Sequence, residues 1–142
     1  MATLVEDGLY DLLSRCARIT AIVSTRIYRG AAPQSASFPF LVFMRTSGDH
    51  VQSLGGSSGL CIAGFDFHCW ARAYDTMASL AEAVRLHLQG LKGQHAGLDI
   101  QGILFDSGET DIPQGPPESG DVWIYRRIVP ATISYSEPQP TL

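Results

Sequence analysis

The sequence lacks three features that would each point to a particular class of protein. No stretch approaches the roughly 20 apolar residues that a membrane-spanning helix needs. No cluster of Lys and Arg occurs, and the net charge of −4 argues against a free-standing nucleic-acid-binding surface. The first residues, MATLVEDGLYDLL, have neither the cationic nor the apolar region of a signal peptide. These absences predict a protein that is made and kept in a cytoplasm.

Cysteine is also scarce, with three residues in the chain. An odd number in a reducing compartment predicts no disulfide framework. Cys61 and Cys69 lie eight positions apart in one strand-like run, so they share a face at a separation of about 26 Å. They are too far apart to bond each other or to share a metal ion. We expect both to be small buried hydrophobic residues.

The polar stretch GDHVQSLGGSSGL, from Gly48 to Leu60, fails as a phosphate-binding loop. A Walker loop needs a Lys and a hydroxyl residue after its last Gly, and no Lys follows Gly59. The dinucleotide pattern GxGxxG is absent, and a strand-like run follows rather than a helix, so no helix N-terminus is available for an anion. Glycines that accept positive φ suit the tip of a long β-hairpin, which is our prediction.

No catalytic, cofactor-binding or metal-binding residues are predicted. The four histidines include no pair at the HxxxH spacing, and no GxSxG motif occurs. His68 stands beside Cys69, but adjacent strand residues point to opposite faces, so they make a poor base and nucleophile pair. The acidic stretch Ser107 to Gly120 lacks the register of a calcium loop and is predicted to be a solvated loop. Its acidic residues are Glu109, Asp111 and Glu118, and Asp121 follows it.

Two segments have helical periodicity. Apolar residues from about Val5 to Arg18 predict a first helix. The stretch YDTMASLAEAVRLHLQGLKG predicts a second, with Asp75 as its N-cap and Gly90 or Gly93 at its end. With 45% apolar and 17% charged residues, the 142-residue chain is expected to form a single domain over residues 1–135. Residues 136–142 are expected to form an extended tail.

The remaining runs predict strands. A short strand is expected at Arg26 to Arg29, followed by a hairpin of FPFLVFMRTSGDHV with LCIAGFDFHCWAR. A second hairpin pairs LDIQGILFD with DVWIYRRIVPATISY, in which Pro130 is expected to bulge or to lie at an edge. In the last run, Arg126 and Arg127 put one guanidinium on each face, and at least one should meet a carboxylate or a neighbouring chain. The fold class is therefore α+β, with a mainly antiparallel sheet, two helices packed on one face and a long β-hairpin loop.

Strand alternation divides LCIAGFDFHCWAR into two faces. The face predicted to be buried carries Cys61, Ala63, Phe65, Phe67, Cys69 and Ala71. The other carries Ile62, Gly64, Asp66, His68, Trp70 and Arg72, and it is too polar for a closed core and too aromatic for open water. The expected core between sheet and second helix consists of Val42, Phe65, Phe67, Leu80, Val84 and Leu88.

Several of these stretches resemble the tail-completion, or tail terminator, proteins of long-tailed phages and gene-transfer particles. The most specific are RIY…APQ…PF, the junction CWA…Y…LAEAVR, and the late YRR. The resemblance runs from about Leu9 to Tyr135. Two departures are an acidic loop longer than the family pattern and Pro130 within the last strand.

The resemblance implies a structural virion protein of the tail or neck, present in the host cytoplasm during assembly. Such proteins form a ring, usually of six copies, that caps the finished tail tube and joins it to head connector proteins. It implies no catalysis, no cofactor and no membrane, and DNA that passes through the lumen without specific binding. The residues expected to contact another subunit or the tail tube lie on the hairpin, the mixed strand face and the last strand: Asp49, His50, Gln52, Leu54, Asp66, His68, Trp70, Arg72 and Arg126.

Two alternatives stay open at this point. The chain is also compatible with another head–tail connector protein of the neck. A small cytoplasmic enzyme or ligand-binding domain is the third reading, carried by the mixed face with Asp66, His68, Trp70 and Arg72. A deep pocket that holds these side chains together would favour the third reading, and a flat self-complementary surface would favour the first two.

Overall fold

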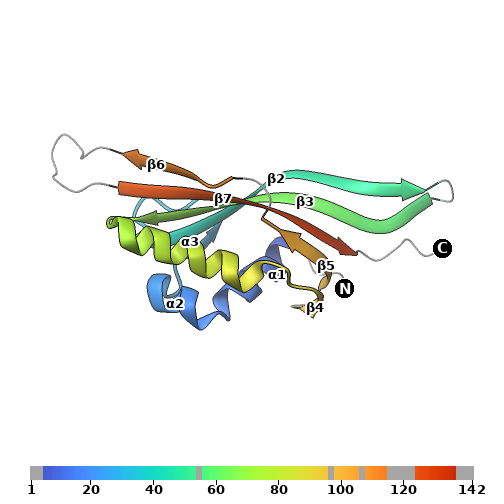
Figure 1. Ribbon diagram of the computed structural model, residues 1–142, viewed down its shortest axis with the longest axis horizontal. Coiled ribbons are helices and arrows are strands. Elements are labelled where there is room, and N and C mark those ends of the chain that lie inside the picture. Colours follow the sequence, from blue (N-terminus) through green and yellow to red (C-terminus); the bar gives the residue numbers. More distant parts are fainter. Residues whose placement is uncertain (1–4, 54–55, 96–97, 106–107, 115–123, 137–142) are drawn as a thin grey trace.

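The computed structural model describes residues 5–53, 56–95, 98–105, 108–114 and 124–136, and it leaves the side chains of residues 49–53, 56–59 and 113–114 undescribed. Within these ranges the chain forms helices on one side of a long sheet (Figure 1). The helices are α1 (Val5–Ser14), α2 (Ala17–Val23) and α3 (Tyr74–Leu88). The strands are β1 (Ile27–Arg29), β2 (Phe40–Ser53), β3 (Gly56–Ala71), β4 (Gly93–His95), β5 (Leu98–Leu104), β6 (Thr110–Gln114) and β7 (Ile124–Ser136).

The sheet has the strand order β1-β2-β3-β7-β5-β4, and β6 also pairs with β7. The described pairs are antiparallel except β1 with β2, which run parallel. The predicted α+β class is confirmed, but the sheet is mixed. After β1, residues 30–39 return the chain to the end of the sheet at which β1 begins. Strand β2 therefore runs in the same direction as β1. A ten-residue segment that contains Pro33 and Pro39 makes this return rather than a hairpin turn.

Three helices replace the two that the sequence predicts. The first predicted helix is interrupted at Cys16, whose backbone is extended at φ −85° and ψ 114°. The second prediction is confirmed as α3, although its N-cap is Ala73 and Asp75 lies inside the first turn. A carboxylate there still interacts favourably with the positive end of the helix dipole. Gly90 follows the helix at φ +77°, a conformation that favours glycine, as predicted.

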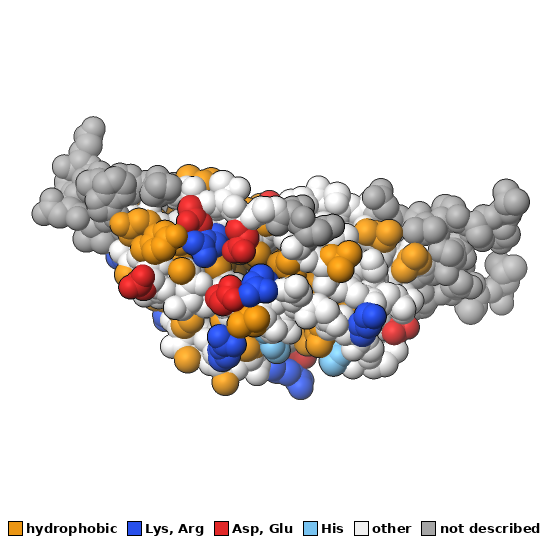
Figure 2. Space-filling model, in the orientation of Figure 1, with side chains coloured by type: hydrophobic (Ala, Val, Ile, Leu, Met, Phe, Trp, Pro, Cys, Tyr) orange, Lys and Arg blue, Asp and Glu red, His pale blue; other side chains and the backbone are white. Residues whose placement is uncertain are grey.

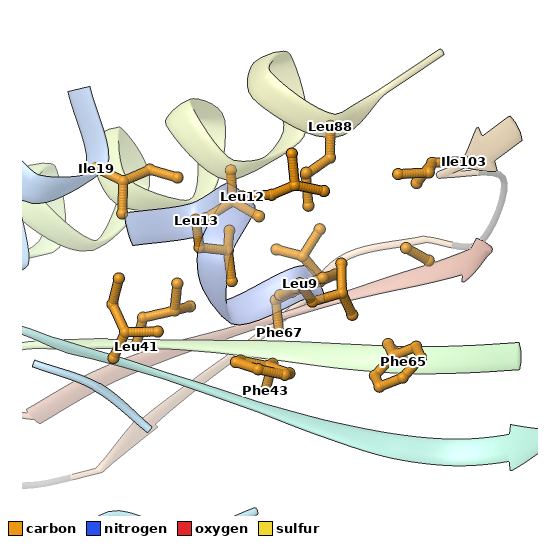
Figure 3. Packing of buried hydrophobic residues seen from close by; sticks show 14 of the residues in the cluster. Leu9, Leu12, Leu13, Ile19, Leu41, Phe43, Phe65, Phe67, Leu88 and Ile103 are labelled. Carbon is orange, nitrogen blue, oxygen red and sulfur yellow. The ribbon is translucent and has the colours of Figure 1, made fainter. Parts of the chain in front are cut away.

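The core lies between the helices and the facing side of the sheet (Figure 3). Phe65 and Phe67 from β3 pack there with Leu88 from α3 and Leu9 from α1, and all four are buried. The predicted burial of Leu80 and Val84 is also confirmed. Cys61 and Cys69 are buried free thiols, as expected.

Val42 is buried on the other side of the sheet from the one predicted. It is only 4% exposed, but it pairs with His68 of β3 and so shares the face that points away from the core. Its neighbours Leu41 and Phe43 take the core positions instead. An apolar strand with buried residues on both faces gives no alternation from which to choose between them.

The stretch from Gly48 to Leu60 is part of a hairpin, as predicted, but its described residues, 48–53 and 56–60, form strand rather than loop. Pairing of β2 with β3 continues to Ser53 and Gly56, with register shifts between Arg45 and Ser47 and between His50 and Gln52. Figure 1 shows the paired ends of both strands extending past the helices. Leu54 and Gly55, between the last pair, lie outside the described residues.

Pro130 lies in the middle of β7 without a bulge against β3. The β3–β7 register is continuous, and Pro130 pairs with Asp66. On the other side of β7, the described pairs with β6 reach Ile128 and those with β5 begin at Thr132. Pro130 therefore falls between two partner strands. This position is a local edge, where a residue without an N–H group is tolerated.

Candidate functional site on the outer face of the sheet

The outer face is the side of the sheet away from the helices, and its residues come from neighbouring strands in register. Phe40 of β2 lies opposite Trp70 of β3, which lies opposite Arg126 of β7. In the next row of this face, Val42 lies opposite His68. Strand pairing thus brings residues that are 26 to 86 positions apart in the sequence onto one patch.

Aromatic rings and guanidinium groups stack on this face. The rings of Phe40 and Trp70 are 5.8 Å apart at an angle of 21°, and Phe38 and Tyr28 pack around Phe40 at 5.0 and 6.0 Å. The guanidinium carbon of Arg126 lies 4.7 Å from the centre of the Trp70 ring. These distances are within the range of favourable ring stacking and cation–π contact. The patch is therefore ordered by its own side chains.

A second arginine repeats the arrangement at the rim. The guanidinium carbon of Arg72 lies 4.5 Å from the centre of the Phe38 ring, and Arg72 is exposed. The structure describes no carboxylate partner for Arg72 or for Arg126. In contrast, Arg15, Arg29, Arg45, Arg85 and Arg127 each form an ion pair with a carboxylate. The outer face therefore carries two arginines for which the described residues offer no ion pair, together with one carboxylate, Asp66.

A cavity of about 330 Å³ opens beside the stacked rings. His68, Trp70 and Arg126 line it together with apolar side chains of β2 and the segment after β1. These further lining residues are Gly30, Ala31, Ala32, Pro33, Phe40, Val42 and Met44. Its walls are thus mostly apolar, with three nitrogen-bearing side chains, His68, Trp70 and Arg126, among them.

Two polar atoms of this cavity lack hydrogen-bond partners among the described residues. They are Nε2 of His68 and Nε of Arg126, and both atoms are buried. His68 as a whole is 9% exposed. Burial, and then the charge of Arg126, lower the pKa of His68, while Asp66 acts in the opposite direction. His68 is therefore neutral at pH 7.

The predicted interface residues separate into three groups. His68, Trp70 and Arg126 meet at the cavity, whereas Asp66 and Arg72 share the outer face but do not line it. Asp49, His50, Gln52 and Leu54 belong to the far end of the hairpin, where no side chain is described. The β2 wall and Pro33 were not predicted from the sequence. The segment APQ, whose Ala32 and Pro33 line the cavity, was singled out only for its resemblance to a family.

A separate polar cluster lies at the end of β6 and β7. Arg127 binds Asp111 through two nitrogens, Nε to Oδ1 at 2.5 Å and Nη2 to Oδ2 at 3.0 Å. The hydroxyl of Tyr74 accepts from Arg127 at 3.0 Å and donates to Asp111 at 3.2 Å. The predicted arginine–carboxylate contact is thus made by Arg127, and Asp111 belongs to a strand rather than to a solvated loop.

Figure 2 shows acidic and basic side chains next to each other on the face in view, with hydrophobic side chains spread between them. The described residues contain no group of three His, Cys, Asp or Glu side chains that could hold a metal ion. None of the described helices is long and apolar enough to span a membrane.

Comparison with known proteins gives two findings. Residues 7–114 match the family model described as tail completion protein gp17. A chain of a solved structure titled "Virion of native gene transfer agent (GTA) particle" has the same fold, with a TM-score of 0.64, 17% identity, and coverage of 90% of this chain and 91% of that chain. No curated protein sequence matches.

Proposed function

The chain belongs to the tail completion protein gp17 family, and from this premise we propose that it forms the ring that completes the tail and joins it to the head. Family membership makes it a structural protein of the phage tail or neck. The finer role is our proposal: several copies, six by resemblance to the family, close on the end of the tail tube and present a docking surface to the head connector proteins.

One observation carries this proposal beyond the family. The outer face joins ordered aromatic rings to two arginines without described carboxylate partners, and aromatic and arginine side chains are enriched where proteins bind one another. Such a surface is expected of a subunit that contacts neighbouring proteins on several sides. The extended β2–β3 hairpin provides a second arm for contact with another subunit or with the tube.

Charge is compatible with DNA that passes through the ring without being held. Each copy carries −4, so six copies carry −24. A lumen within an acidic ring repels phosphates, whereas a binding protein would neutralise them with clustered Lys and Arg.

The cavity bears on the alternative of a ligand-binding domain or an enzyme. It brings together two of the four mixed-face residues, His68 and Trp70, with Arg126, and its walls hold no hydroxyl, thiol, amine or carboxylate side chain. Family membership favours a structural role, and we treat the cavity as part of a protein interface. No observation favours another neck protein over the tail-completion ring.

The experiment that tests the proposal is deletion of the gene from its phage or prophage, followed by electron microscopy of the lysate. We expect filled heads and separate tails, and joined particles when the gene is restored from a plasmid. Normal joined particles without the gene would contradict the proposal. Heads that leak DNA, with tails still joined to them, would favour a connector role.

A further inference from the structure

Two residues of the cavity wall, His68 and Arg126, each hold a buried nitrogen atom that the described chain leaves without a hydrogen bond. Buried polar atoms in folded proteins are normally bonded, so such an atom often marks the place of a missing partner. Arg126 donates through Nε, and His68 donates through Nε2 when that nitrogen carries the proton. Both residues line one cavity, and the guanidinium group of Arg126 has further N–H donors beside Nε.

The side chains of the cavity walls indicate the chemical class of the missing partner. Arginine binds carboxylates strongly because its planar donors match their two oxygens. Phe40, Trp70 and Pro33 offer flat apolar surfaces of the kind on which proline-containing extended peptides dock. The cavity therefore fits a peptide that carries a carboxylate next to proline.

This chain contains such a peptide directly after β7. Residues 137–142 read EPQPTL, with Glu137 followed by Pro138 and Pro140. We propose that this segment of a neighbouring copy occupies the cavity, with the Glu137 carboxylate on Arg126 and the prolines against Trp70 and Phe40. The inference rests on the proposed function and deepens it, because it names a contact that would join neighbouring copies.

The segment of residues 137–142 is too short to make the same contact within one copy. Arg126 and Ser136 are ten residues apart on one straight strand, which is about 33 Å. The six residues from 137 to 142 span at most about 21 Å when fully extended. The segment starts at the opposite end of β7 from the cavity, and only another copy can supply it.

Peptide binding to the full-length chain is the direct test. A fluorescently labelled peptide of residues 135–142 is titrated with dilute protein, and binding is followed by anisotropy. We expect saturable binding that weakens about tenfold or more when the peptide carries Glu137→Gln or the protein carries Arg126→Met. Arg85→Met, on the outside of α3, should leave binding unchanged. Equal binding of a scrambled peptide, or no binding, would overturn the inference.

A charge exchange tests the contact between whole subunits. Sedimentation velocity compares the wild type with Arg126→Glu, with Glu137→Arg and with the double variant. Each single variant should self-associate less, and the double variant should recover because the pair is restored in reverse. A melting curve confirms that each variant is folded, and the peptide titration with wild-type protein remains informative if Arg126→Glu does not fold. Single variants that associate like the wild type would overturn the inference.

The two proposals fail in different ways. If the gene is required for joining but the peptide does not bind, the tail-completion role stands and this contact is wrong. If the peptide binds at the cavity but deletion of the gene leaves joined particles intact, the contact stands as a self-association site and the proposed role is wrong.

Discussion

Arg127 on β7 and Asp111 on β6 stand directly opposite each other and form a two-nitrogen ion pair, completed by the hydroxyl of Tyr74 from α3. The contact connects β6 to the first turn of a helix that otherwise packs on β3 and β7. Among the described residues, β6 pairs with β7 alone. This ion pair is therefore a principal side-chain contact that holds β6 in place. Hydrogen bonds from Arg127 lower the pKa of Asp111.

Replacing Asp111 with Asn should therefore loosen β6 with a small loss of global stability. We expect at most about 1 kcal/mol, because the pair is partly exposed and screened by water. Hydrogen exchange should show faster amide exchange in β6 and unchanged exchange in β3.

The pH dependence supplies the internal check on this prediction. A carboxyl group with a lowered pKa stabilises the fold above its unfolded pKa of about 4 and ceases to do so as the pH falls through its folded pKa. The difference between wild type and Asp111→Asn should vanish at low pH. Glu82→Gln, which removes an exposed pair within α3, is the matched control and should leave β6 exchange unchanged.

His68 should make the protein less stable as the pH falls below about 6.5, the ordinary pKa of histidine. Its folded pKa is lowered by burial and by Arg126, so the unfolded chain takes up the proton first and unfolding is favoured. Urea denaturation of wild type and His68→Leu between pH 7.5 and 5.5 measures this. The wild type should lose stability more steeply than the variant. Parallel curves would show that His68 is solvated, contrary to its burial.

Truncation of Phe67 tests the core. The side chain is fully buried on β3, between Phe43 and Phe105, and Phe67→Ala should cost about 3–5 kcal/mol of unfolding free energy. Leu104→Ala is the control, since Leu104 is 57% exposed and such changes usually stay within about 0.5 kcal/mol. A loss below about 1 kcal/mol for Phe67→Ala would contradict the assignment of the β3 faces.

The hairpin can be shortened without disturbing its register. Replacing Ser53–Ser58 with Asn-Gly places Gln52 opposite Gly59, which continues the pairing of His50 with Cys61 and closes it with a favoured two-residue turn. We expect normal folding and lost joining of heads to tails if the hairpin end contacts a neighbour or the tube. Unchanged joining would show that the end of the hairpin is a passive connection.

Patterns within single segments predicted much of this fold. Alternation along β3 correctly assigned both its faces, and helical spacing found α3, because each signal depends only on neighbouring residues. The break at Cys16 was missed because no Gly or Pro marks it. The parallel pairing of β1 was missed because it depends on the path of residues 30–39, which has no regular pattern.

The candidate site was predicted only in part, because patterns within single segments identify some of its residues and not others. Two of its residues, His68 and Trp70, were identified from an unusual mixture of polar and aromatic side chains on one strand face, and Arg126 from the arginine pair of the last strand. The wall formed by Phe40, Val42 and Met44 was not predicted. In an apolar run, residues on both faces of the strand are candidates for the core, so the pattern does not show which face lines the cavity. The partner of Arg127 was also missed, because Asp111 lies in a segment that composition alone assigns to loop.

The gap opposite Pro130 makes the sheet tolerant of changes in chain length. The described pairs attach β5 and β6 to separate stretches of β7, and none of these pairs involves Val129, Pro130 or Ala131. Added or deleted residues between positions 105 and 109 would therefore leave the registers of β2, β3 and β7 in place. Relatives in this family should vary in length there, and beyond β6, more freely than within the strands that shape the cavity. Evolution could therefore adapt this end of the molecule to a different head or tail tube. The surface through which we propose that copies of the chain bind each other would stay the same.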